Sequence, residues 1–166
     1  MFRDCTSLTT APELPATTIG QGCYSNMFRG CTSLEIAPEL PATTVQNYCY
    51  SNMFDGCTSL TTAPELPATE LMVQCYQEMF KNCSNIDEIT CLATNISAAN
   101  CVNGWLSGVS ASGTFYKDPS MTGWVVGTNV PSGWTIEDYG SNSGSGSGSG
   151  GGNMDNPDDP GDDTEI

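Results

Sequence analysis

Apolar residues recur along the first two thirds of the chain at a fixed spacing of 26 positions. Equivalent positions form columns, the clearest of which are Phe2, Phe28, Phe54, Phe80 and Leu106; Leu8, Leu34, Leu60 and Ile86; and Leu14, Leu40, Leu66 and Leu92. A repeat of this length allows each coil to bury its apolar face against its neighbours, which a single coil cannot do. The pattern predicts a continuous stack of about four coils, at 1–26, 27–52, 53–78 and 79–104.

Each coil is predicted to contain one helix. In the second coil, Val45, Cys49 and Met53 fall at i, i+4 and i+8, which is one apolar stripe of helical period, and Thr43 or Thr44 can cap its start. The column after the stripe holds only residues that tolerate the left-handed conformation of a helix C-terminus. Its members are Asp4, Gly30, Gly56, Asn82 and Gly108.

Each coil is also predicted to contain one short strand, over a run such as 60–66. The first proline of the phrase Ala-Pro-Glu-Leu-Pro cannot donate a ladder hydrogen bond, so we expect about three to five strand residues with a bend near Pro12, Pro38 or Pro64. The fold class that follows is an α/β solenoid, a stack of strand-helix coils over 1–112.

The chain leaves the 26-residue period after about Ser112. Residues 113–139 predict a β-rich C-terminal cap, because a terminal coil lacks a neighbour on one face. The aromatic residues near this end are interpreted either as a cap that closes the core or as a ligand platform; they are Trp105, Phe115, Tyr116, Trp124 and Trp134. Residues 140–152 predict a Gly/Ser linker, and residues 153–166 an acidic disordered tail.

The charge balance limits the partners that the chain can have. The net charge is −15, with no histidine and four basic residues, Arg3, Arg29, Lys81 and Lys117. Nucleic acid and anionic membrane surfaces should repel such a chain, and no apolar run is long enough to cross a bilayer. No signal peptide is visible at the start, which predicts a fragment, a truncated reading frame or another route of export.

The repeat phrase Gly-Cys-Thr-Ser-Leu-Thr-Thr-Ala-Pro-Glu-Leu-Pro-Ala-Thr, preceded by Met-Phe, resembles the BspA-type leucine-rich repeats of Bacteroidales surface proteins. The segment Gly-Thr-Phe-Tyr-Lys-Asp-Pro-Ser-Met-Thr-Gly-Trp is similar to the ending of such proteins. The resemblance covers about residues 1–139. It implies a right-handed solenoid, a cell-surface or secreted location, binding to other proteins and no catalysis. It differs at Ala-Pro-Glu-Leu-Pro, where many members carry Ile-x-Ile-Pro.

Nine cysteines allow three interpretations. Eight lie in two columns, Cys5, Cys31, Cys57 and Cys83, and Cys23, Cys49, Cys75 and Cys101, while Cys91 has no column. A disulfide framework is the first interpretation, although helices stacked 8–10 Å apart would hold the second column too wide to bridge. A zinc site is the second, but the chain has no Cys-x-x-Cys and no histidine. Buried thiols that act as small apolar residues are the third and the favoured one.

One column of carboxylates is the candidate binding strip. Glu13, Glu39 and Glu65 repeat at the same place in successive coils, where they form either a solvated acidic stripe or a strip that accepts a basic partner or a divalent cation. Carboxylates at strand spacing would hold Ca²⁺ poorly without further oxygen ligands. We therefore predict neither a metal nor another cofactor.

Two functions from different classes follow. The first is a non-enzymatic, adhesin-like protein-binding repeat module of a surface or secreted protein, whose partner could be a host or matrix protein. The second is a structural spacer or a phage virion-associated repeat protein. Catalysis is not expected, because the repeats lack histidine and every recognisable nucleophile or phosphate-binding motif. An uncovered N-terminal edge predicts self-association.

Overall fold

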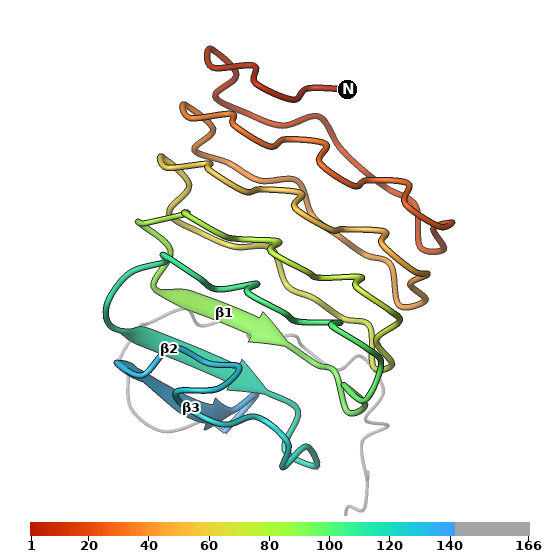
Figure 1. Ribbon diagram of the computed structural model, residues 1–166, viewed down its shortest axis with the longest axis vertical. Coiled ribbons are helices and arrows are strands. Elements are labelled where there is room, and N and C mark those ends of the chain that lie inside the picture. The colour runs from red at the N-terminus through yellow and green to blue at the C-terminus, as the bar shows by residue number, and fades with distance from the viewer. Residues whose placement is uncertain (142–166) are drawn as a thin grey trace, which may run out of the picture.

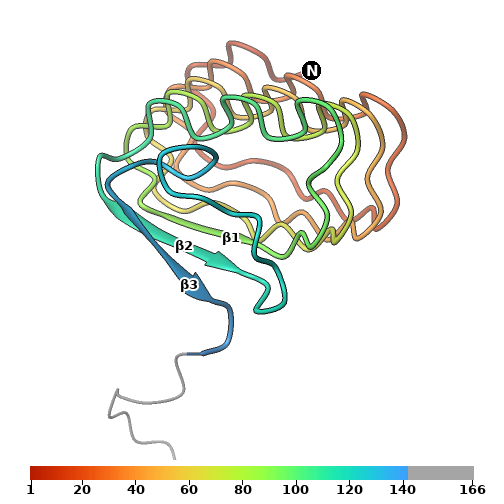
Figure 2. The same cartoon turned by 60° about the horizontal axis from the view of Figure 1, so that its bottom comes forward.

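The computed structural model describes residues 1–141 and shows a stack of coils that ends in a small parallel sheet (Figures 1 and 2). The sheet has three strands in the order β1 (Glu88–Cys91), β2 (Gly113–Lys117) and β3 (Trp134–Asp138). Its register aligns Ile89 with Phe115 and Phe115 with Ile136. All but the first two positions of the predicted linker, together with the predicted acidic tail, lie outside the described residues.

Successive coils lie side by side with equivalent positions in register, as the 26-residue spacing predicts. Isolated parallel bridges join Thr10 to Ile36, Ile36 to Thr62, and Thr18 to Thr44. Figure 1 shows the same relation as coils that follow one another from red through green. Equivalent side chains therefore meet across the stack, and each coil buries its apolar residues against the next.

The predicted α/β solenoid of strand-helix coils is wrong, because the described part of the chain contains no helix. The segments expected to be helical are runs of turns, which we call turn ribbons; they span 20–31, 46–57, 72–83 and 98–109. In the second ribbon the N–H groups of Cys49, Ser51 and Met53 each donate to the carbonyl three residues earlier, at 3.1–3.3 Å. The N–H groups between them donate to carbonyls of the next coil, as Tyr50 does to Cys75 at 3.0 Å.

This alternation explains why a ribbon replaces a helix. An α-helix uses every interior N–H within itself, by donation to the carbonyl four residues earlier. A turn ribbon uses only every second N–H internally and sends the others to the neighbouring coil, so the backbone itself joins the stack. An apolar stripe at i, i+4 and i+8 fits both structures, because the ribbon also repeats every four residues.

The four-residue repeat of the ribbon requires left-handed backbone at every fourth position. In the first ribbon these positions are Gly22, Asn26 and Gly30, with φ of 64°, 56° and 74°. The column predicted to be left-handed is confirmed throughout, with φ between 59° and 80° at Asp4, Gly30, Gly56, Asn82 and Gly108. It marks one of several turns in the ribbon and not the end of a helix. Tyr48, at φ 61°, carries a side chain where that conformation is costly.

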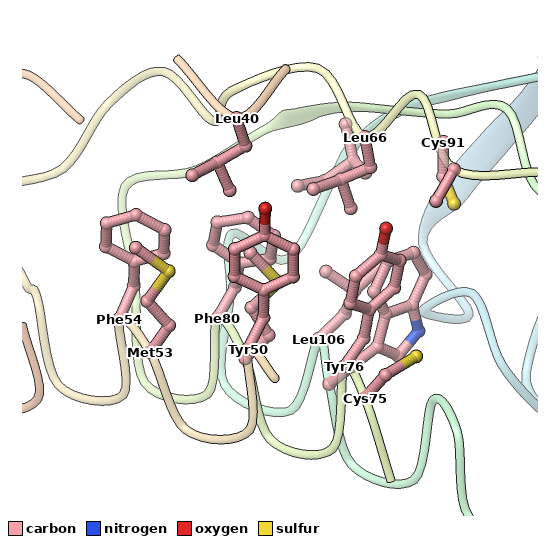
Figure 3. Packing of buried hydrophobic residues seen from close by; sticks show 14 of the residues in the cluster. Leu40, Tyr50, Met53, Phe54, Leu66, Cys75, Tyr76, Phe80, Cys91 and Leu106 are labelled. Atoms are coloured by element: carbon pink, nitrogen blue, oxygen red, sulfur yellow. The ribbon is translucent and has the colours of Figure 1, made fainter. Parts of the chain in front are cut away.

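Aromatic ladders run through the core along the stack. The rings of Phe2, Phe28, Phe54 and Phe80 stack with centroids 5.5–5.7 Å apart and planes within 11° of parallel. A second ladder joins Tyr24, Tyr50, Tyr76 and Trp105 at 5.9–6.4 Å. Figure 3 shows members of both ladders together with Leu40 and Leu66, which project toward them from the opposite side of the coil.

The proline side of the coils differs from the prediction in the first three coils and agrees with it in the fourth. Coils with the Ala-Pro-Glu-Leu-Pro phrase form single bridges instead of strands of three to five residues. The fourth coil has no proline at this place, and there β1 forms four consecutive strand residues. Removal of the proline restores the ladder donor that the earlier coils lack.

The fourth coil is also one residue shorter on this side, which corrects the third apolar column. Leu66 bridges Cys91 and not Leu92, and Cys91 is completely buried while Leu92 is only partly buried. Cys91 therefore occupies the place of the column leucine, which explains the one cysteine that the spacing left unassigned.

The aromatic residues near the C-terminal end close the core, as the first of the two interpretations predicts. Trp105, Phe115, Trp124 and Trp134 are each no more than 5% exposed, whereas Tyr116 is partly exposed. The Trp105 indole donates to the Asn129 carbonyl at 2.7 Å and the Trp134 indole to the Ser110 carbonyl at 2.8 Å. The rings of Trp105, Phe115 and Trp124 pack on one another with centroids 4.8–5.9 Å apart, so these buried rings present no aromatic platform.

Candidate functional site

The glutamate column lies on the outer surface of the proline side. Glu13, Glu39 and Glu65 are all exposed, and the leucine that follows each of them is buried. Alternation along this extended segment turns the glutamate outward whenever the leucine enters the core. The structure therefore brings the three predicted residues onto one face, which we call the glutamate strip.

Shallow hollows separate the members of the strip. One, of about 450 Å³, lies between the first two coils and is lined by Glu13 and Glu39 with Pro15, Pro38 and Pro41. A second, of about 420 Å³, continues from Glu39 to Glu65 along Pro41 and Pro67. Proline rings make these walls rigid and apolar, while the carboxylates supply negative charge at their rims. None of the four basic residues lines these two hollows.

Glu65 differs from the other two members of the strip. The Tyr139 hydroxyl, just after β3, donates to Glu65 Oε2 at 2.8 Å, and this hydrogen bond raises the pKa of Tyr139. Within residues 1–141, Glu13 and Glu39 make no side-chain hydrogen bond and no ion pair. The part of the strip that is open to a partner is therefore its N-terminal half.

Charged residues on the ribbon side are used to join coils. Asp55, with a side chain only 8% exposed, accepts a charged contact from Arg29 at 3.1 Å and a hydrogen bond from Asn82 at 3.1 Å. Glu78 accepts hydrogen bonds from Lys81 at 3.1 Å and Asn52 at 2.8 Å, and these bonds lower the pKa of Glu78. This network was not predicted from the sequence, although its members fall in three columns of period 26: Arg29, Asp55 and Lys81; Asn52 and Glu78; and Asn82.

The cysteines are free thiols, and seven of the nine are buried. The favoured interpretation is therefore confirmed for those seven, while Cys5 and Cys23 are exposed. Cys31, Cys57 and Cys83 donate their S–H groups to phenylalanine carbonyls of the preceding coil at 2.9–3.2 Å. Residues 1–141 contain no cluster of three or more metal-ligating side chains.

Burial raises the pKa of the core thiols, to about 11 for Cys49 and about 12 for Cys57 and Cys91. A thiolate is the form that reacts, so these groups are inert at neutral pH.

We expect a disulfide reagent such as DTNB to modify Cys5 and Cys23 rapidly in the folded protein at pH 8, because only these two thiols are exposed. The other seven should react at the rate of global or local opening. The measurement is the time course of absorbance for the folded protein and for the protein unfolded in about 8 M urea. A burst of more than two thiols without urea would contradict the structure.

The chain matches no protein-family model, no curated protein and no solved structure. Within the described residues, no helix has the length and apolarity needed to cross a membrane. The arrangement that remains is an exposed, repeated acidic face with rigid hollows, on a stack whose Asp55 and Glu78 carboxylates pair with Arg29 and Lys81.

Proposed function

We propose that this chain is a non-enzymatic protein-binding module that engages a basic segment of a partner protein through its glutamate strip. The observation that carries the proposal is the repetition of an exposed carboxylate beside rigid apolar hollows in successive coils. Repeat stacks bind through extended surfaces built from equivalent positions, and this strip is such a surface. Proline walls lose little conformational freedom on binding, which reduces the cost of association.

A surface or extracellular location, and a host or matrix protein as the partner, remain part of the proposal. They rest on the likeness of the repeat phrase to the BspA-type repeats. The binding mode rests on the geometry of the strip alone, since the helices that a leucine-rich repeat implies are absent from the described coils.

Replacement of Glu13 and Glu39 together by glutamine should weaken capture of the partner about tenfold, because two charge contacts of roughly 0.7 kcal/mol each are removed. The measurement is a pull-down with immobilised host extracellular-matrix proteins, followed by titration of the captured protein at two salt concentrations. Binding by the unaltered chain should also fall at high salt.

The matched control is the double variant Glu70→Gln and Glu88→Gln, which removes the same charge from exposed positions that line neither hollow of the strip. Equal losses in both double variants would show a general charge effect and overturn the proposal. Failure of the unaltered chain to capture any protein would favour the alternative, a structural spacer or virion-associated component.

A further inference from the structure

Every second N–H group of the last turn ribbon, 98–109, is equivalent to one that donates to the next coil in the earlier ribbons. In the described part of the chain no further ribbon follows to accept these hydrogen bonds. The outward N–H groups of ribbon 98–109 form a row and belong to Asn100, Val102, Gly104, Leu106 and Gly108. Among residues 1–141 none of these five N–H groups finds an acceptor. The internal donors of the same ribbon are paired as usual, for example Trp105 N–H with the Val102 carbonyl.

The preceding ribbon shows what the row is built to hold. Its equivalent N–H groups donate to carbonyls of ribbon 98–109 at 2.8–3.1 Å, as Tyr76 does to Cys101 and Glu78 to Asn103. The acceptors lie on alternate residues of a chain that is itself a turn ribbon. Five donors in the same register therefore match the carbonyls of one further ribbon.

The cap covers the core but leaves this row open. β2 and β3 continue the stack beyond β1, on the other side of the coil (Figure 2). The loop 127–132 stands opposite the ribbon, and a hollow of about 370 Å³ lies between them. Val102, Gly104 and Leu106, three of the five donors, line this hollow, so a ligand that enters it meets their edge of the ribbon.

The shape of the opening decides between possible occupants. A second copy of this chain could not continue the stack in register, because its first proline-side segment would need the place that β2 occupies beside β1. A single peptide segment needs no such place. The facing wall offers Thr128, Asn129 and Ser132 and no charged side chain, which suits a neutral peptide backbone.

We propose that this edge, which we call the donor edge, binds a turn-forming peptide segment of a partner protein, whose alternate carbonyls accept hydrogen bonds from ribbon 98–109. The segment should carry glycine or asparagine at every fourth residue, as the first and the last ribbon of this chain do. This site is independent of the glutamate strip, from which it differs in place, charge and mode of recognition.

The test uses the full chain and a synthetic peptide with the sequence of residues 20–31, in which both cysteines are replaced by serine. Amide hydrogen exchange is followed by NMR at the five donors. Saturating peptide should slow their exchange at least about fivefold, because a hydrogen-bonded amide exchanges only when the bond opens. A control peptide with alanine at the three positions equivalent to Gly22, Asn26 and Gly30 should have little effect, since alanine disfavours left-handed backbone.

Two variants obstruct the hollow, and one serves as their control. Thr128→Tyr fills the hollow from the exposed loop, and Ser107→Glu places a carboxylate beside the donors; both should abolish the protection. Thr6→Tyr adds the same ring at an exposed position of the first coil and should leave it intact. Unchanged exchange at the other amides verifies that each variant is folded.

Absence of protection at saturating peptide would overturn the proposal, as would equal protection by the alanine peptide. Protection that survives in both Thr128→Tyr and Ser107→Glu would place the peptide elsewhere and also overturn it. Protection of the five donors by high concentrations of the chain alone, with a dimer in light scattering, would assign the edge to a second copy instead.

Discussion

Replacement of Phe54 by alanine is expected to lower the free energy of unfolding by about 3–5 kcal/mol. Phe54 is completely buried and stacks on Phe28 at 5.7 Å and on Phe80 at 5.5 Å. Its loss opens a cavity in the middle of the ladder, where neighbours held by backbone hydrogen bonds on both sides have little freedom to collapse. Urea denaturation followed by circular dichroism measures the change.

The matched control is Phe2→Ala, in the same ladder. Phe2 is only partly buried and has one stacking partner, Phe28, so its removal should cost clearly less. Equal costs for the two variants, or a cost below about 1 kcal/mol for Phe54→Ala, would show that the ladder contributes little to stability.

The second large effect is a loss of stability at alkaline pH. In the unfolded chain the thiols titrate near pH 9, whereas burial holds the pKa of Cys49 at about 11 and that of Cys57 and Cys91 at about 12. Above pH 9 the unfolded chain therefore binds fewer protons than the folded one. Stability is fully present below pH 9 and falls as the pH rises toward 12, by about 1.4 kcal/mol per pH unit for each such thiol.

The measurement is the urea midpoint between pH 8 and 11 in the presence of a non-thiol reductant. Cys57→Ala should reduce the slope by about one proton, at some cost in stability at pH 8. The control variant is Cys5→Ala, which removes an exposed thiol and leaves the buried thiols in place. A midpoint that does not move over this range would contradict the burial of the thiols.

The period of 26 residues was sufficient to predict which side chains lie next to one another, because stacking depends on equivalence and not on the local conformation. The stacked positions of Phe28, Phe54 and Phe80 and the alignment of Glu13, Glu39 and Glu65 on one face follow from it. Where the repeat lost one residue, the column was assigned to Leu92 when it belongs to Cys91. A fixed step of 26 residues does not reveal a one-residue deletion, yet the deletion changes which residue enters the core.

The helix was predicted wrongly because an α-helix and a turn ribbon can both place apolar side chains on one face at every fourth residue. The distinguishing signal was present in the first ribbon, where Gly22, Asn26 and Gly30 stand four residues apart. Only the last of them was interpreted, as the end of a helix. In the third ribbon the left-handed positions Gln74 and Glu78 carry ordinary side chains, so no local preference could have revealed the turns there. Hydrogen bonds to the adjacent coils impose that conformation.

The donor edge could not be predicted from the sequence at all. It depends on which N–H groups leave the coil, and that follows from the ribbon geometry. The hollows beside Glu39 likewise arise from the separation of adjacent proline segments, although the glutamates themselves were identified by their spacing.

The shared direction of the hydrogen bonds between ribbons has an electrical consequence. In the first three ribbons the linking N–H groups point toward the cap, and their acceptor carbonyls in the following coil point back toward the first coil. Peptide groups aligned in this way add their moments, as they do along a helix axis. The ribbons therefore contribute a dipole whose positive end lies toward the cap, in a chain whose net charge is −15.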